Sequence, residues 1–253
     1  MIESFEKTKL AGSIAAGALD EVNNIIKPGL STLEIDNLCY QYINDHKAYS
    51  APLYYRGYPR TCCTSTNHIV CHGVPSEKIL KNGDIINVDV TAIKDGWHGD
   101  TSRMFIVGEC SVKAKKLIKT TYESMMKAIS IIKANIKIGN IGNIIQKNVE
   151  AEGFSVVRDF CGHGIGQKFH ESPNVLHYGD KDSGQKLKAG MIFTVEPMIN
   201  SGRFETKTLN DGWTAVTKDK SLSAQFEHTV GVTKEGYEIF TLSKKGLNFP
   251  PNL

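Results

Sequence analysis

LKNGDIINVDV (residues 80–90) decides the fold of this chain, because a similar stretch, LKAGMIFTVEP (residues 187–197), follows later. The two stretches align without a gap, and Asp89 of the first falls on Glu196 of the second. A single match of this length can arise by chance. Its weight depends on whether other parts of the chain repeat at a similar offset.

A second pair of stretches does so. IKPGLSTLEI (26–35) resembles IKIGNIGNII (136–145) at nearly the same offset. Two matches together favour an internal duplication, and the offset is far too long for a solenoid repeat. We therefore expect one domain over residues 1–253, built from two halves at approximately 1–110 and 111–253.

The coarse pattern of elements agrees with two α+β halves. Apolar residues recur every three to five positions after the first residues, as in an amphipathic helix. Ser31-Thr-Leu-Glu34 is a capping box that opens a second helix. The second half repeats this order, and strands follow the helices in both. The predicted helices cover residues 4–26, 31–46, 112–135 and 141–152.

The first repeat unit continues into a hairpin, NVDVTAIKDGWHGDTSRMF (87–105), with a two-residue turn at Asp95-Gly96. In that register Asp89 and Asp100 are diagonal neighbours on one face, roughly 7–8 Å apart at Cα. Two ionised carboxylates at this separation repel unless a cation lies between them. The alternative is a pair of exposed aspartates at a sheet edge.

Composition excludes several classes of protein. The 253 residues carry a net charge of +3, too small to indicate nucleic-acid binding. No apolar run approaches the roughly 18 residues of a membrane span, and the start is not a signal peptide. The six cysteines form no CxxC metal pattern. We expect reduced thiols and a cytoplasmic location.

Three further residues complete a metal-ligating set. His163 stands between two glycines, which we take as room for an ion. Glu196 ends one strand, and Glu227 lies in an alternating segment (223–229) that we expect to pair with it. Four buried carboxylates require compensating cations, and an oxygen-rich set with one imidazole favours Mn²⁺, Fe²⁺ or Co²⁺ over structural zinc. Five other histidines are expected to be ordinary structural residues: His46, His68, His98, His177 and His228.

Six motifs stand along the chain in this order: VCHGVP (70–75), NVDV (87–90), HGDTSRMF (98–105), CGHGIGQKFHESPNV (161–175), TVEPMI (194–199) and SLSAQFEHT (221–229). In sequence and in order they resemble the motifs of the type I methionine aminopeptidases of the short bacterial or organellar form. The resemblance covers nearly the whole length of the chain. It implies a pita-bread α+β fold, two divalent metal ions (Co, Mn or Fe(II), with Zn possible), and removal of the initiator methionine from new chains.

The resemblance also implies a role for each ligand. Asp89 would hold one metal, His163 and Glu196 the other, and Asp100 and Glu227 would bridge both. Water between the metals would attack the peptide carbonyl, with Glu196 as proton shuttle. His72 and His170 would contact the scissile amide nitrogen and the carbonyl oxygen, one each, so the implied catalytic residues are His72, His170 and Glu196.

The implied methionine pocket is apolar and aromatic, which suits a thioether. The segment before it departs from the bacterial pattern, with Pro52 in place of a cysteine and Tyr54 in place of a glycine. A monovalent cation site near Asn67 and Ser223 is also implied. The pocket positions are Tyr55, Tyr58, Cys63, Phe169 and Trp213, with His72 and His170 beside them.

Three alternatives remain open: an Xaa-Pro peptidase of the same fold, a non-catalytic peptide-binding relative, and a dinuclear phosphoesterase. We expect a monomer that acts on peptide and protein N-termini, without nucleic-acid or membrane partners, and leave open a transient ribosome contact. Because Ile2 is β-branched and a small second residue is implied, we also expect Met1 to be retained.

Overall fold

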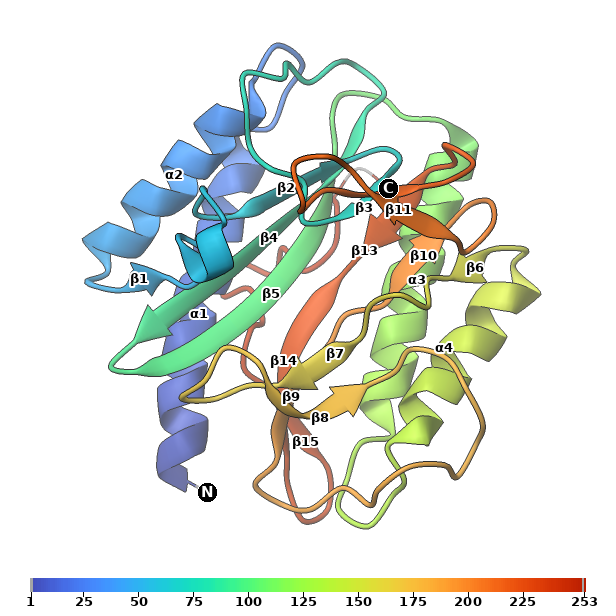
Figure 1. The fold of residues 1–253 in the computed structure, drawn as a ribbon. Coiled ribbons are helices and arrows are strands. Elements are labelled where there is room, and N and C mark those ends of the chain that lie inside the picture. Colours follow the sequence, from blue (N-terminus) through green and yellow to red (C-terminus); the bar gives the residue numbers. More distant parts are fainter. Residues whose placement is uncertain (1, 252) are drawn as a thin grey trace.

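The computed structural model describes residues 2–251 and 253, so the prediction for Met1 falls outside the described residues. All the predicted helices form (Figure 1). The capping box is present: the Ser31 hydroxyl accepts a hydrogen bond from the Glu34 N–H, and the Glu34 carboxylate accepts one from the Ser31 N–H. The helices are α1 (Ile2–Ile25), α2 (Thr32–Asp45), α3 (Val112–Ser130) and α4 (Gly139–Ala151).

Helix α3 ends at Ser130, whereas the apolar spacing predicts an end near residue 135. Ile132 lies beyond the helix and is nonetheless fully buried in the core. Asn135 has a φ of 73°, a left-handed conformation that a helix cannot contain. The apolar pattern continues past Ser130 because the connection after α3 also packs on the core, not because the helix continues.

In the described part of the chain, the central sheet has nine strands and draws on both halves of the sequence. Its order is β1-β4-β5-β14-β9-β7-β8, with β2 paired to β4 and β15 paired to β14. Strands β5 and β14 lie side by side and antiparallel at its centre (Figure 1). These strands are β1 (Tyr49–Ser50), β2 (Cys63–Thr66), β4 (Ile85–Lys94), β5 (Trp97–Ile106), β7 (Gly162–Gly164), β8 (Glu171–Val175), β9 (Ile192–Val195), β14 (Glu227–Val232) and β15 (Tyr237–Ile239).

Two small sheets and one short helix complete the fold. One sheet has the order β13-β10-β6 and the other β11-β12-β3. The remaining elements are η1 (Tyr55–Gly57), β3 (Ile69–Cys71), β6 (Ser155–Val156), β10 (Met198–Asn200), β11 (Thr206–Thr208), β12 (Ala215–Thr217) and β13 (Ser223–Gln225).

The alternating segment 223–229 is not one strand, as the sequence predicts, but two. Residues 223–225 form β13 and pair with β10, while β14 begins at Glu227 and pairs with β9. Phe226 lies between them and is buried in the core. The predicted pairing with residues 191–196 is confirmed for β14, and Glu227 is the first residue of that strand.

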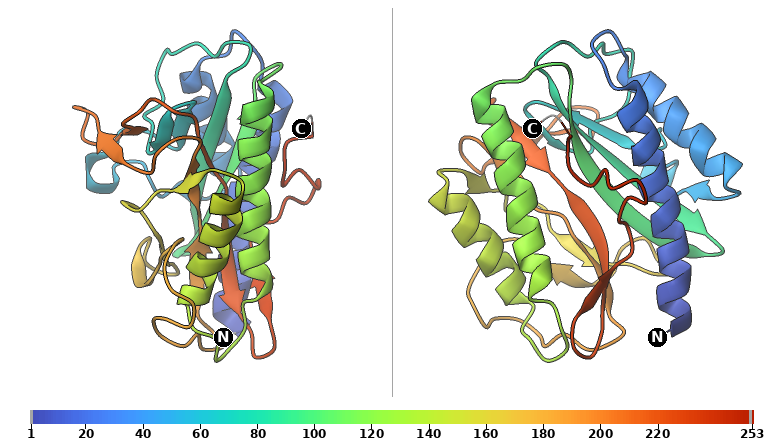
Figure 2. Two further views of the ribbon diagram at one scale, coloured as in Figure 1. Left: turned by 90° about the vertical axis from the view of Figure 1, so that its right-hand side faces the viewer. Right: turned by 180° about the vertical axis from the view of Figure 1, so that it is seen from behind.

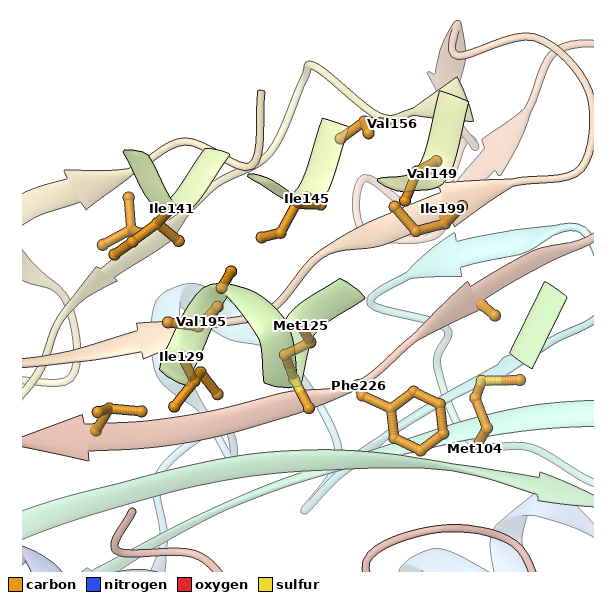
Figure 3. Packing of buried hydrophobic residues seen from close by; sticks show 14 of the residues in the cluster. Met104, Met125, Ile129, Ile141, Ile145, Val149, Val156, Val195, Ile199 and Phe226 are labelled. Carbon is orange, nitrogen blue, oxygen red and sulfur yellow. The ribbon is translucent and has the colours of Figure 1, made fainter. Parts of the chain in front are cut away.

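The four helices cover one face of the central sheet (Figure 2). Helices α1 and α2 pack behind the β4–β5 hairpin, and α3 and α4 pack behind the second half. Ile141, Ile145 and Val149 of α4 lie over Met125 and Ile129 of α3 (Figure 3). Val88 and Val90 of β4 belong to the core beneath α1, so Asp89 between them lies on the opposite face of the sheet. Among the described residues, no helix is long and apolar enough to cross a membrane.

Candidate metal centre and peptide cavity

The β4–β5 hairpin has the predicted register. Lys94 pairs with Trp97 across the turn, so Thr91 lies opposite Asp100 and Asp89 lies opposite Ser102. Asp89 and Asp100 are therefore diagonal neighbours on one face. Asp100 is buried and Asp89 is half-buried, which excludes a pair of exposed edge carboxylates.

The second half brings three more ligand candidates to the same face. His163 is on β7, Glu196 directly follows β9, and Glu227 begins β14, which lies between β9 and β5. The Nε2 atom of His163 is 3.7 Å from Oδ2 of Asp100 and 3.6 Å from Oε1 of Glu196. Ligand atoms of Asp100, His163 and Glu227 all lie within 4.8 Å of one another, close enough to share a metal ion.

The glycines beside His163 have a different role from the predicted one. A Cβ atom on Gly162 would lie 2.4 Å from the carbonyl oxygen of Thr194. A Cβ atom on Gly164 would lie 2.1 Å from the carbonyl oxygen of Ser172. The neighbouring chain segments, not an ion, occupy the space that these glycines leave. The glycines let β7 pack closely enough to bring His163 to the carboxylates.

Two threonines that the sequence analysis did not single out hold the carboxylates in place. Thr91 donates a 2.6 Å hydrogen bond to Oδ1 of Asp100, and Thr194 donates a 2.7 Å bond to Oε1 of Glu196. Thr194 also accepts a hydrogen bond from the His163 N–H. The available signal was their i, i+2 spacing from Asp89 and Glu196, which places them on the same strand face.

The raised pKa values of the four carboxylates indicate that their cluster suits bound cations. Burial raises the pKa of Asp100 to about 7 and that of Glu196 to about 8. Burial, together with the neighbouring carboxylates, raises the pKa of Asp89 and Glu227 well above their ordinary values. Ionising four such groups together requires positive charge, and divalent ions supply it.

His163 complements the carboxylates as a neutral ligand. Burial lowers its pKa to about 4, so the ring is uncharged at neutral pH. Its Nδ1 lies 3.0 Å from the Gly164 carbonyl oxygen, which can only accept. The proton therefore sits on Nδ1, and Nε2 presents a lone pair toward Asp100 and Glu196. A backbone carbonyl that fixes the tautomer in this way is typical of metal-binding histidines.

A cavity of about 610 Å³ opens onto these ligands, and every residue assigned above to ligand, catalytic or pocket roles lines it. Cys63 lies opposite Asp89 across the β2–β4 pair, which joins the apolar wall to the ligands. Tyr58 and Trp213 meet edge to face at 5.1 Å, and Tyr55 and Phe169 at 5.0 Å. Lining residues outside the predicted set include Asp159, Phe160, Cys161, Glu171 and Met198.

Two histidines face the cavity without joining the ligand cluster. His170 has its ring centre 4.2 Å from that of His163, and its Nδ1 is 3.1 Å from the Tyr55 hydroxyl. Burial, with the adjacent His163, lowers the pKa of His170 to about 3. His72 meets Phe160 edge to face and has a left-handed backbone with φ of 56°. Strained backbone of this kind is concentrated at functional sites.

The departures from the bacterial pattern lie at the cavity rim. Pro52 lines the cavity, whereas Tyr54 is 79% exposed. Tyr54 has a φ of 66°, which lies in the region that glycine adopts without strain. The backbone thus keeps the conformation that suits the family's glycine, although a tyrosine stands there.

Asn67 and Ser223 are brought together as expected. The Ser223 N–H donates a 2.8 Å hydrogen bond to the Asn67 carbonyl oxygen, while the buried Ser223 hydroxyl has no hydrogen-bond partner among the described residues. Of the histidines predicted to be structural, His177 is buried and accepts a 3.0 Å bond from the Glu196 N–H. It therefore supports a ligand-bearing backbone.

Comparison with known proteins decides the family. The model for metallopeptidase family M24 matches residues 6–234. The methionine aminopeptidase of Rickettsia prowazekii (strain Madrid E) is 54% identical over 250 residues, 98% of this chain and 96% of the relative. The methionine aminopeptidase of Escherichia coli (strain K12) is 54% identical over 244 residues, 96% of this chain and 92% of the relative. The chain belongs to the methionine aminopeptidases of metallopeptidase family M24.

Solved structures agree with this membership. The crystal structure of methionine aminopeptidase from Rickettsia prowazekii matches with a TM-score of 0.95 at 53% identity, covering 96% of this chain and 98% of that one. A prolidase from Pyrococcus furiosus matches with a TM-score of 0.75 at 21% identity, covering 95% of this chain and 64% of that one, and shares the fold. The predicted pita-bread fold is confirmed, and M24 membership identifies a metallopeptidase.

Proposed function

We propose that this chain is a metal-dependent aminopeptidase that removes the N-terminal methionine from new polypeptides whose second residue is small. The observation that carries the proposal is the convergence of Asp100, His163 and Glu227, with ligand atoms within 4.8 Å, on the wall of an aromatic cavity. Family membership supplies the reaction class, and the cavity supplies a place for the methionine side chain.

We assign two divalent ions to the buried cluster. Asp89 would hold one ion, His163 and Glu196 the other, and Asp100 and Glu227 would bridge them. Four carboxylates with raised pKa values and one neutral imidazole support this assignment. When bound, such a pair activates water and polarises a carbonyl group. The oxygen-rich set favours Co²⁺, Mn²⁺ or Fe²⁺, and Zn²⁺ is the alternative.

The chain's own residues would then carry the proton and fix the substrate. Glu196 would accept the proton of the attacking water and deliver it to the leaving amine. The hydrogen bond from Thr194 holds its carboxylate in one orientation. His72 and His170 would donate hydrogen bonds at the scissile amide nitrogen and the developing oxyanion, one each. Donors placed there stabilise the transition state by a few kcal/mol, of the order of 3 kcal/mol per donor.

We assign the methionine side chain of the substrate to the aromatic part of the cavity. Its wall combines Tyr55, Tyr58, Cys63, Phe169 and Trp213. Contacts between a thioether sulfur and aromatic rings contribute about 0.3–1.5 kcal/mol each, beyond the burial of the side chain itself. The flexible methionine side chain fits an irregular aromatic pocket better than a β-branched one does.

The finer assignments complete the proposal. We place the enzyme in the cytoplasm, where new chains carry their initiator methionine, and expect it to act as a monomer. A transient contact with the ribosome would be consistent with this role. We also propose a monovalent cation at Asn67 and Ser223, supported by their direct hydrogen bond and by the unpaired Ser223 hydroxyl.

Three substrates test the proposal in one experiment. Met-Ala-Ser, an Xaa-Pro peptide and a phosphodiester are each incubated with the protein, with a divalent metal and with excess chelator. Release of methionine from Met-Ala-Ser, abolished by chelator and restored by metal, is the expected result. Hydrolysis of the Xaa-Pro peptide or the phosphodiester in its place would overturn the proposal, as would activity that survives the chelator.

A further inference from the structure

His98 occupies a place that links the metal-binding hairpin to the cavity wall. It lies on β5 two residues before Asp100, so the two side chains share a face of the strand. Its N–H donates a 2.8 Å hydrogen bond to the Gly166 carbonyl oxygen, and its Nδ1 lies 2.9 Å from the same oxygen. Because a carbonyl oxygen only accepts hydrogen bonds, Nδ1 carries the proton. His98 therefore donates two hydrogen bonds to Gly166, one from its backbone N–H and one from Nδ1.

The ring of His98 makes a second contact with the same loop. It stacks on Phe169 with ring centres 5.7 Å apart and planes 12° apart. Phe169 in turn lies 4.1 Å from the ring of His170 and 5.0 Å from that of Tyr55. A continuous series of rings therefore runs from the hairpin to the histidine that faces the cavity.

The loop at 165–170 connects the paired strands β7 and β8, and other contacts hold its two ends. At its start Ile165 is buried in an apolar cluster with Phe5 and Phe240. The Ile165 N–H bonds to the Ile192 carbonyl at one end, and His170 meets the Tyr55 hydroxyl at the other. Between these ends, the Gly166 N–H bonds within the loop, to Lys168. His98 supplies two hydrogen bonds and a stacked ring to this middle part, so it contributes directly to where Gly166 and Phe169 lie relative to the ligands.

We propose that His98 is a positioning residue for the reaction: it anchors the 165–170 loop on β5 so that Phe169 and His170 face the substrate. His98 itself does not line the cavity and would act only through the loop. The inference rests on the proposed function for the role of His170. From its sequence alone, His98 is expected to be an ordinary structural histidine, and its contacts with Gly166 and Phe169 give it the further role proposed here.

A double-mutant cycle with His170 tests the proposal. His98→Ala should lower kcat by about tenfold to a hundredfold, because a displaced donor is lost from the transition state, and should also raise KM, because Phe169 of the proposed methionine pocket is displaced with it. In a His170→Ala background the same change should alter kcat by less than about twofold, since the group it positions is absent. Equal losses of kcat in both backgrounds, or no loss in either, would overturn the proposal.

Two further variants separate the hydrogen bond to Gly166 from the stacking on Phe169. His98→Asn keeps a side-chain donor near Nδ1, and His98→Phe keeps the stacked ring. Each should recover part of the activity that His98→Ala loses, and thermal unfolding shows which variants fold. If both fold like the wild type and neither exceeds His98→Ala in kcat, the anchoring contacts are not what matters and the proposal fails.

His46 is a matched control. Its Nδ1 also lies 2.8 Å from a backbone carbonyl oxygen, that of Tyr42, and its ring also stacks, on the Tyr42 ring. It is exposed at the end of α2 and does not line the cavity. His46→Ala should leave kcat and KM unchanged. A loss of kcat equal to that of His98→Ala would attribute the effect to general destabilisation and overturn the proposal.

A readout without turnover distinguishes this inference from the proposed function. In protein prepared without added metal, nitrogen-15 NMR of the imidazoles should show His98 as the Nδ1–H tautomer, and His98→Ala should shift the His170 signals. Unshifted His170 signals would refute the anchoring role. If the wild type releases no methionine but these signals behave as expected, the proposed function fails while the anchoring role of His98 stands.

Discussion

The hydroxyl of Thr194 donates a 2.7 Å hydrogen bond to Oε1 of Glu196 and accepts one from the N–H of His163. One small side chain thus fixes two ligand candidates that come from different strands. Glu196 also has its backbone N–H held by the buried His177. The carboxylate proposed to move the proton is therefore held at both its side chain and its backbone, and its removal is the most direct test.

Glu196→Gln should fold like the wild type and lose nearly all turnover. The amide keeps the shape of the side chain and can still accept the Thr194 bond, but it cannot take up a proton at neutral pH. General acid–base groups contribute about 10²–10⁴-fold, so we expect kcat to fall by at least 10²-fold. Circular dichroism checks that the variant folds, and steady-state kinetics measures its kcat. A variant that retains more than about a tenth of the wild-type kcat would refute the shuttle role.

Thr194→Val should weaken divalent metal binding by about 10–100-fold, because losing an outer hydrogen bond to a ligand typically has this effect. Thr194→Ser keeps the hydroxyl and should bind metal nearly as the wild type does. Calorimetric titration with Mn²⁺ measures both affinities.

Thr121→Val is the control for the loss of a buried hydroxyl. Thr121 is fully buried on α3 and bonds to the Leu117 carbonyl, away from the cavity. Its substitution should leave metal affinity unchanged. If Thr121→Val and Thr194→Val weaken binding equally, the hydrogen bond to Glu196 is not the cause.

The predictable part of the site is the part that depends on local pattern. The Asp95-Gly96 turn and the alternation around it predicted the register that places Asp89 beside Asp100, and the structure has that register. The capping box at Ser31 likewise predicted the start of α2. Short-range rules of this kind need no knowledge of the rest of the chain. The resemblance and the repeat then identified Glu196 as the partner of Asp89.

The rest could not be predicted because it depends on contacts between distant segments. The contact between His98 and Gly166 could not be predicted, because nothing near His98 in the sequence shows that Gly166 folds back onto its strand. The end of α3 was misplaced because Ile132 is buried in the connection after the helix, and apolar spacing does not distinguish a buried connection from a helix. The glycines beside His163 were assigned to an ion because the carbonyls of Thr194 and Ser172 could not be placed.

The metal-free protein should lose stability as pH rises from about 6.5 to 8. The pKa of Asp100 is raised from 3.8 to about 7 and that of Glu196 from 4.5 to about 8, so the folded state holds these protons more tightly than the unfolded chain. Stability from such groups is complete below the unfolded values and is lost as pH rises through the folded ones. Histidines with lowered pKa act in the opposite direction, but only below their ordinary value of 6.5.

Thermal unfolding in chelator across this pH range measures the effect. The melting temperature of the wild type should fall with rising pH, and that of Glu196→Gln should fall less steeply. Saturating divalent metal should remove the dependence of the melting temperature on pH, because the ions compensate the charge of the carboxylates. A melting temperature that rises from pH 6.5 to 8 in chelator would show that these carboxylates are not protonated in the folded metal-free state.

The chain should be a poor substrate for its own proposed activity. It begins Met1-Ile2, and a β-branched second residue is stiff at χ1 and cannot turn its bulk away from the cavity wall near His72. Intact-mass analysis of untagged protein should find Met1 retained, and Ile2→Ala should lose it. Because Ile2 begins α1, the folded helix itself could hinder processing. The free peptides Met-Ile-Glu and Met-Ala-Glu remove that difference and should show the same preference. Cleavage of Met-Ile-Glu at the rate of Met-Ala-Glu would refute the steric account of specificity while leaving the peptidase assignment intact.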